Sequence, residues 1–156
     1  MLNVPGVAGA NRVEVRRSTS TDFYPHYQAI YENVYSERPA LRGAVRTESE
    51  DNLADCLAIN LLFEIYVDGK WSGVVAADRR TVAGIHGVYM VEIVLEQSAR
   101  GQGLGPAVHR RLAAAVADVQ PTDIILGTIS DKNPWSRQTA LRAGRLQIGA
   151  WHWIRL

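Results

Sequence analysis

The residues with the clearest chemical potential lie in the stretch ARGQGLGP, residues 99–106. Three glycines, at 101, 103 and 105, follow Arg100, and a helical pattern begins directly after them. A helix N-terminus exposes unpaired N–H groups and carries about half a positive charge, and glycines let an anion approach the backbone closely. Arg100 adds a charged donor suited to phosphate oxygens. The sequence therefore predicts an anion site at the start of this helix.

Two common phosphate-binding motifs do not fit the stretch. The dinucleotide-binding fingerprint requires glycine at its sixth position, which is Pro106 when counted from Gly101. A P-loop requires Gly-Lys followed by Ser or Thr, and the stretch contains no lysine. Both interpretations of the glycines therefore fail on residue identity.

The elements that must position this loop follow from hydrophobic periodicity and turn residues. A helix begins at a Thr21-Asp22 cap and ends before Pro39, and Asp68-Gly69 marks a hairpin. Pro134 and Gly144 bracket the last helix. The expected strands lie within 11–19, 61–67, 71–78, 86–96, 123–130 and 145–156, and the other helices within 46–60 and 107–119. This order predicts a mixed, three-layer α/β domain over residues 12–156, after a flexible N-terminus at 1–11.

Composition narrows the classes of protein to consider. The chain of 156 residues has a formal net charge of +1, which argues against a nucleic-acid binder that uses a broad basic face. Cys56 is the only cysteine, so an internal disulfide and a cysteine-built zinc site are excluded, and a reducing, cytoplasmic setting is expected. No run of about 20 apolar residues occurs, so no membrane association is expected. The four histidines are scattered, with no spacing that would bind a metal on one helix face, so no metal site is expected.

The loop and its flanks resemble one enzyme superfamily. RGQGLG resembles the signature Gln/Arg-x-x-Gly-x-Gly/Ala of the GCN5-related N-acetyltransferase (GNAT) superfamily, with Arg100, Gly103 and Gly105 in its fixed places. VEIVLEQSARGQGLG (91–105) is similar to the fourth strand of that family and its turn into the pyrophosphate loop. NPWSRQTALRAGR (133–145) resembles the helix after the fifth strand. The resemblance implies an acyl-CoA N-acyltransferase fold whose central mixed sheet is splayed between strands four and five.

The resemblance also implies a reaction and a set of binding residues. The reaction is direct transfer of an acetyl group from the thioester of acetyl-CoA, as co-substrate, to a primary amine. Main-chain groups near the end of strand four pair with the pantetheine arm, loop amides hold the pyrophosphate, and the start of the last helix positions the pantetheine end. The implied residues are Ile93, Val94, Leu95, Arg100, Gly101, Gln102, Gly103, Leu104, Gly105, Pro106 (which removes one amide donor), Asn133 and Ser136.

The catalytic groups are less evident than the binding loop. An amine is mostly protonated at pH 7, so a base must remove a proton before attack. Glu92 is the first candidate because it lies inside an apolar strand, on the face of Val94, where burial raises its pKa. The alternative is a structural carboxylate satisfied by a neighbouring strand. Glu64 is the second candidate.

The sequence does not identify a single residue as the general acid. Many relatives carry a tyrosine four residues before the final glycine of the last helix, and this chain has Ala140 there. Either the thiolate leaves without help, or Ser136 or Tyr89 supplies the proton. This departure keeps an alternative function open, a non-catalytic acetyl-CoA-binding protein of the same fold. A nucleotide-binding module of another class is the second alternative.

Fold analogy places the acceptor, a small-molecule or peptide amine, beside the first two helices. That side holds Tyr27, Tyr31, Tyr35 and residues 36–48. His109, flanked by arginines, is expected to be solvated or to cap its helix. Cys56 is expected in the core, and Trp151 and Trp153 in core or dimer packing, so a homodimer is possible.

Overall fold

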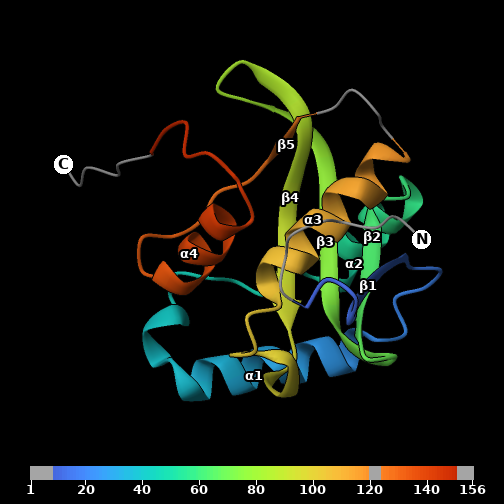
Figure 1. Cartoon of the computed structure of the whole chain (residues 1–156), viewed down its shortest axis with the longest axis vertical. Coiled ribbons are helices and arrows are strands. Elements are labelled where there is room, and N and C mark those ends of the chain that lie inside the picture. Colours follow the sequence, from blue (N-terminus) through green and yellow to red (C-terminus); the bar gives the residue numbers. More distant parts are fainter. Residues whose placement is uncertain (1–8, 120–123, 151–156) are drawn as a thin grey trace.

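The computed structural model describes residues 9–119 and 124–150, which form a five-stranded sheet flanked by helices (Figure 1). The strand order is β1-β2-β3-β4-β5. Neighbours are antiparallel as far as β4, whereas β4 and β5 run parallel. The strands are β1 (Val13–Arg17), β2 (Leu62–Val67), β3 (Lys70–Val82), β4 (Ile85–Leu95) and β5 (Ile125–Leu126). The mixed α/β class predicted from the sequence is confirmed.

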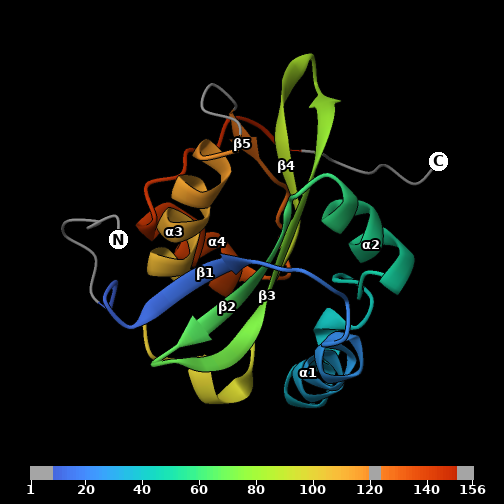
Figure 2. The ribbon, with the colours of Figure 1, turned by 90° about the vertical axis from the view of Figure 1, so that its right-hand side faces the viewer.

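The helices form two layers, one on each face of the sheet. Figure 2 shows α1 and α2 on one side of the strands and α3 and α4 on the other. The helices are α1 (Tyr24–Glu37), α2 (Glu50–Ala58), α3 (Gly105–Ala117) and α4 (Pro134–Arg142), with 3₁₀ turns η1 (Pro39–Leu41) and η2 (Gln97–Ala99). No helix in these described ranges is both long and apolar enough to cross a membrane.

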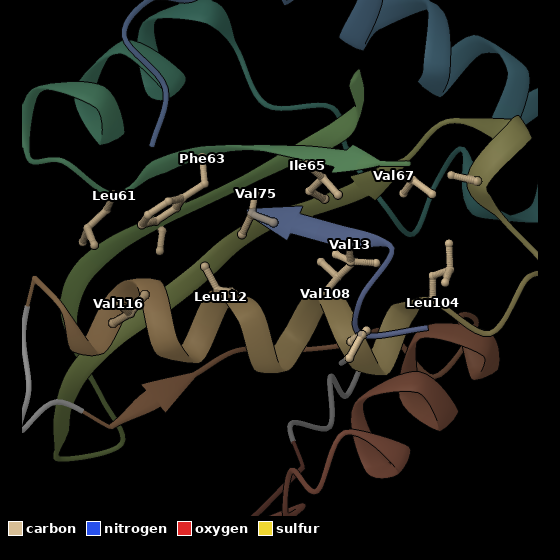
Figure 3. Close-up of a cluster of buried hydrophobic side chains, with 14 of the residues drawn as sticks. Val13, Leu61, Phe63, Ile65, Val67, Val75, Leu104, Val108, Leu112 and Val116 are labelled. Atoms are coloured by element: carbon tan, nitrogen blue, oxygen red, sulfur yellow. The ribbon is translucent and has the colours of Figure 1, made fainter. Parts of the chain in front are cut away.

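The apolar core under α3 fixes the helix to the sheet. Figure 3 shows Val108, Leu112 and Val116 of α3 facing apolar side chains of β1, β2 and β3. Leu112 is 1% exposed and Val108 is completely buried. The helical spacing of these residues therefore buries one stripe, as the sequence predicts. Cys56 lies in the second cluster, between α2 and the sheet, and its expected core position is confirmed.

Helix ends follow the predicted proline positions better than the predicted caps. Pro25 lies in the first turn of α1, which ends at Glu37, before Pro39. The predicted Thr21-Asp22 cap is wrong, because Phe23 occupies the N-cap position without a side-chain hydrogen bond. The end is instead tied by the backbone, where the amide of Tyr24 donates to the carbonyl of Thr21. Helix α3 starts at Gly105, two residues before the predicted start.

The C-terminal strands differ most from the expectation. The strand expected over 123–130 contains only Ile125–Leu126, because β5 leaves β4 after Leu126 and the next residues have no neighbouring strand with which to pair. Residues 145–150 form no strand, and Leu146 and Ile148 are 86% and 70% exposed. The predictions for Trp151, Trp153 and the rest of 151–156, and for residues 1–8, lie outside the described residues.

Candidate functional site

The site is built around a fork between β4 and β5. The two strands pair only at Val88 with Ile125 and Tyr89 with Leu126. Beyond Tyr89, β4 continues to Leu95 and, within the described part of the chain, pairs only with β3. Alternate backbone groups of a strand point to its two edges. The stretch containing Ile93, Val94 and Leu95 therefore presents backbone donors and acceptors along an edge without a strand partner.

This edge ends in the glycine loop. Gly101 and Gly103 have φ values of +74° and +72°, a conformation that strains other residues. No backbone amide from 101 to 105 donates a hydrogen bond within the described residues. These amides precede the first turn of α3, with Pro106 as its second residue. The structure therefore leaves these amides without internal partners, within the described residues, at the place where the sequence predicts an anion site.

Two side chains of the loop contact other elements. The Nη1 atom of Arg100 donates to Glu37 Oε2 at the end of α1 (3.0 Å), while its Nε and Nη2 atoms are buried and have no hydrogen-bond partner among the described residues. Gln102 accepts from Arg12 Nη2 (2.8 Å) and donates to the Ser98 carbonyl (2.6 Å). The Gln102 side chain therefore stabilises the loop, and its contribution to an anion site is confined to its backbone.

The second half of α4 lies against the start of α3. A Cβ atom placed on Gly105 would lie 2.4 Å from Thr139 Cγ2, so any larger residue at 105 would require this side chain to move. Asn133 caps α4 by accepting from the Ser136 amide (3.2 Å). Ser136 and Thr139 share a helix face at i and i+3. Ser136 therefore lies on the face of α4 that contacts the start of α3, and Asn133 caps the same helix.

A β-bulge in β4 sets the direction of Glu92. Ala76 pairs with Glu92 and Ala77 with Met90, which leaves Val91 as an extra residue. Glu92 shares a face with Val94, as predicted, and that face lies toward α1, whereas Met90 packs against the cluster under α3. Strict alternation would place Met90 on the face of Glu92. The bulge therefore separates a polar position from the apolar side of the same strand.

The Glu92 carboxylate is buried in a shell of hydrogen-bond donors. Its exposed fraction is 5%. The Tyr31 hydroxyl lies 2.9 Å from Oε1 and 2.8 Å from Oε2, and the Tyr27 hydroxyl donates to Oε2. The amide of Ile93 donates to Oε1 (2.7 Å). Burial raises the pKa of Glu92 to about 7, against the opposing effect of these donors.

The tyrosines of α1 also hold the segment before α2. The Tyr27 hydroxyl accepts from the Glu48 amide (2.8 Å), and the Tyr24 hydroxyl donates to the Glu48 carbonyl (3.2 Å). The Tyr35 hydroxyl donates to the Val45 carbonyl (2.9 Å). One row of tyrosines, at helical spacing, thus contacts both the candidate base and residues 45–48. We call these four residues the 45–48 segment.

The sequence missed the partners of Glu92. The structural alternative for this residue expected a neighbouring strand to satisfy the carboxylate, but its side-chain partners come from α1. The tyrosines were predicted on the acceptor side without this role. Their spacing at 24, 27, 31 and 35 is a signal for a row on one helix face. It gives no signal for the strand residue that the row contacts.

The other candidate residues have different surroundings. Glu64 on β2 accepts from Ser18 Oγ (2.8 Å), and β3 lies between this strand and β4, which carries Glu92. Tyr89 occupies the last β4–β5 pair before the fork, and its hydroxyl lies 2.6 Å from Thr128 Oγ1. Neither residue is hydrogen-bonded to Glu92. Tyr89 therefore remains a predicted acid at the fork, whereas Glu64 lies with the β1–β2 side of the sheet.

His109 is not the solvated residue that its arginine neighbours suggested. Its exposed fraction is 9%, and burial, together with the charge of Arg145, lowers its pKa to about 4. Arg145 follows α4 and donates to the Ile125 carbonyl (3.4 Å). The helical period explains the error, because position 109 lies on the same buried stripe as 112 and 116.

Solved structures share this arrangement of elements. A tetramutant of the BH1408 protein from Bacillus halodurans matches with a TM-score of 0.66 and 14% identity, over 91% of this chain and 99% of that chain. A predicted acetyltransferase from Clostridium acetobutylicum, with acetyl-CoA, matches with a TM-score of 0.62 and 16% identity, over 92% and 96%. An aminoglycoside acetyltransferase from an uncultured soil metagenomic sample, in complex with sisomicin, matches with a TM-score of 0.58 and 11% identity, over 94% of this chain and 98% of that chain.

These likenesses define the fold. No protein-family model matches the sequence, and no curated protein does. The splayed mixed sheet with a glycine loop at the end of β4 is an acyl-CoA N-acyltransferase architecture. The chain has the fold of the GNAT acetyltransferases, as the glycine motif predicts.

Proposed function

We propose that this protein is an acetyl-CoA-dependent N-acetyltransferase that acetylates a primary amine of a small molecule or peptide. The observation that carries the proposal is the fork, where an unpartnered edge of β4 leads into the glycine loop and the start of α3. An edge of this kind accepts an amide-containing arm such as pantetheine, and the loop amides suit a pyrophosphate. The fold-sharing acetyltransferases support the same activity.

The residues present fit acetyl-CoA as the co-substrate. The amides from 101 to 105 have no partners in the part of the chain that the structure describes, and Gly105 lets α4 approach the loop closely. In the proposal these amides hold the pyrophosphate, the backbone of 93–95 holds the pantetheine arm, and Asn133 and Ser136 border its reactive end. Acetyl-CoA supplies an acetyl group activated as a thioester.

Glu92 supplies the base in this proposal. Its pKa of about 7 leaves a large ionised fraction at neutral pH, which suits removal of a proton from an ammonium group. The carboxylate is buried, so the proton reaches it through water or through a small opening of the tyrosine shell. The acid that protonates the leaving thiolate is assigned to Tyr89 at the fork, with Ser136 on α4 as the second candidate.

Calorimetric titration with acetyl-CoA tests the binding half of the proposal. Gly103→Asp adds a negative charge at the loop, and nothing lies within 4 Å of the added Cβ atom. Gly84→Asp is the matched control, because Gly84 has a similar φ of +79°, equally open space, and lies in the β3–β4 turn. Both variants carry the same added charge and similar backbone strain.

Micromolar binding by the wild type and by Gly84→Asp, lost in folded Gly103→Asp, supports the cofactor assignment. A panel of amines with acetyl-CoA then tests turnover, and Glu92→Gln tests the base. Equal binding by all three proteins contradicts the loop assignment. Failure of the wild type to bind acetyl-CoA contradicts the proposed function.

One observation favours a second function. Ala140 occupies the place of the usual tyrosine and is buried, 6% exposed, so α4 provides no acid at that position. A non-catalytic protein that binds acetyl-CoA as a signal fits this feature. Binding in the calorimeter without turnover of any amine distinguishes this function from the enzyme.

A further inference from the structure

Every group that hydrogen-bonds to the Glu92 carboxylate donates to it. The amide of Ile93 can only donate. The Tyr27 oxygen already accepts from the Glu48 amide, so its single proton is directed to Glu92 Oε2. The Tyr31 hydroxyl oxygen lies 2.9 Å from Oε1 and 2.8 Å from Oε2, within donating distance of both. The shell therefore matches an ionised carboxylate, which only accepts hydrogen bonds.

We propose that Tyr27 and Tyr31 are positioning residues that hold Glu92 ionised and oriented, and that Tyr27 couples this carboxylate to the 45–48 segment. The role of Glu92 as a base rests on the proposed function, whereas its ionisation can be measured without any substrate. The tyrosines themselves stay protonated, because burial and the neighbouring carboxylate raise their pKa values.

The balance of forces at Glu92 shows what the hydroxyls contribute. Burial disfavours the charged form, and each donated hydrogen bond favours it. A hydrogen bond to a charged group contributes roughly 1.5–3 kcal/mol, comparable to one or two pKa units. Removing one hydroxyl therefore moves the ionisation of Glu92 measurably, while the packing of the aromatic ring is retained.

The coupling to the acceptor side follows from the second hydrogen bond of Tyr27. The Glu48 amide fixes the direction of the Tyr27 proton, so the backbone of the 45–48 segment sets one of the donors to Glu92. The titratable groups that face Glu92 are Tyr27 and Tyr31 from α1 and Glu48 from the 45–48 segment. Binding of an amine substrate that moves this segment thus changes the proton affinity of Glu92.

The direct test is a titration of the glutamate side-chain carboxyl groups by ¹³C NMR between pH 5 and 9. The Glu92 resonance is identified by its loss in Glu92→Gln. We expect a midpoint near 7 in the wild type. Tyr31→Phe and Tyr27→Phe should raise it by roughly one unit or more. Tyr35→Phe is the matched control, because Tyr35 belongs to the same row and contacts Val45 but not Glu92.

An unchanged midpoint in folded Tyr31→Phe overturns the proposal, as does an equal shift in Tyr35→Phe. Tyr27→Phe also leaves the Glu48 amide without its acceptor. If that variant fails to fold, Tyr31→Phe decides the positioning role. Replacing Glu48 by proline, which removes the amide, then tests the coupling separately. Glu48→Gln is the matched control, because it removes the carboxylate that also raises the pKa of Glu92 but keeps the amide. Equal midpoints in folded Glu48→Pro and Glu48→Gln contradict the coupling.

An activity measurement separates this inference from the proposed function. If the midpoint of Tyr31→Phe rises by one unit, the ionised fraction of Glu92 at pH 7 falls about fivefold. The rate constant kcat/KM should fall by the same factor at pH 7 and recover by pH 9. A uniform loss at every pH indicates a merely structural role. If the wild type has no transferase activity, the proposed function fails, and the NMR titration still decides the role of the tyrosines.

Discussion

The two faces of the sheet are formed by the same strands but bury different kinds of side chain. The face under α3 packs an apolar cluster that includes Phe63, Ile65, Val75 and Leu112. The face under α1 also has an apolar cluster, but its tyrosines carry hydroxyls that converge on a buried carboxylate. The bulge at Val91 lets β4 serve both faces. The face under α3 therefore buries mainly apolar side chains, whereas the face under α1 also buries the titratable carboxylate of Glu92.

Glu92 is buried on the α1 face and His109 on the α3 face, and the pKa shifts of these two side chains affect stability with opposite signs. The pKa of Glu92 rises from 4.5 to about 7 on folding, so the unfolded chain loses this proton first and stability falls as pH rises through that window. The pKa of His109 falls from 6.5 to about 4, so the unfolded chain binds this proton first and stability falls as pH drops. Between about pH 4.5 and 6.5 the two contributions oppose each other.

The largest effect is expected on the apolar face. Leu112→Ala removes a side chain that is 1% exposed and should lower the free energy of unfolding by about 2–5 kcal/mol. Chemical denaturation at several pH values measures this loss. Because Leu112 does not titrate, the loss should be similar at pH 5 and pH 8. A loss that varies strongly with pH would show that the two faces are not independent.

The next effect isolates the polar face. Glu92→Gln removes the cost of ionising a buried carboxyl, so the wild type should lose stability relative to the variant as pH rises from 4.5 to 7. The difference should change by on the order of 3 kcal/mol across this window. Unfolding curves at half-unit pH steps measure it. A constant difference would mean that Glu92 ionises with an ordinary pKa.

His109→Gln tests the opposite slope. The wild type should lose stability relative to this variant as pH falls from 6.5 to 4, again by on the order of 3 kcal/mol. The same unfolding series provides the measurement. The single variants at Glu92 and His109 should each steepen the pH dependence, in opposite directions. Slopes of the same sign would contradict the comparison of the two faces.

The smallest effect concerns the tyrosine row away from the carboxylate. Tyr35→Phe removes a hydrogen bond to the Val45 carbonyl and should cost about 1 kcal/mol. The cost should not depend on pH between 5 and 8, since Tyr35 does not contact Glu92. Denaturation midpoints at the two ends of this range suffice to measure it. A pH-dependent cost would extend the Glu92 network along the helix.

The sequence predicted the features that depend on local backbone and spacing. The glycine loop, the start of α4 at Pro134 and the buried stripe of α3 each follow from residues close together in the chain. Glu92 could be predicted because a carboxylate inside an apolar strand is conspicuous. The position of His109 on the buried stripe was also visible in the helical period, and the flanking arginines obscured it.

The remaining features depend on long-range contacts. Tyr31 and Tyr27 lie 61 and 65 positions from Glu92 in the chain. Their meeting requires the bulge at Val91, which no residue pattern in β4 announces. The length of β5 was overestimated because an apolar run predicts a strand whether or not a neighbour continues beside it. Strand pairing ends at the fork, and that is a property of the sheet rather than of the segment.

The fork between β4 and β5 also affects the tendency of the protein to associate with other polypeptide chains. An unpaired strand edge is a template for another polypeptide and a common starting point for aggregation. Here the edge from Met90 to Leu95 is in the middle of the strand order, between β3 and the diverging β5. In the proposed function, acetyl-CoA lies along this edge and satisfies its backbone groups. Its binding would then also protect the protein from association with other chains.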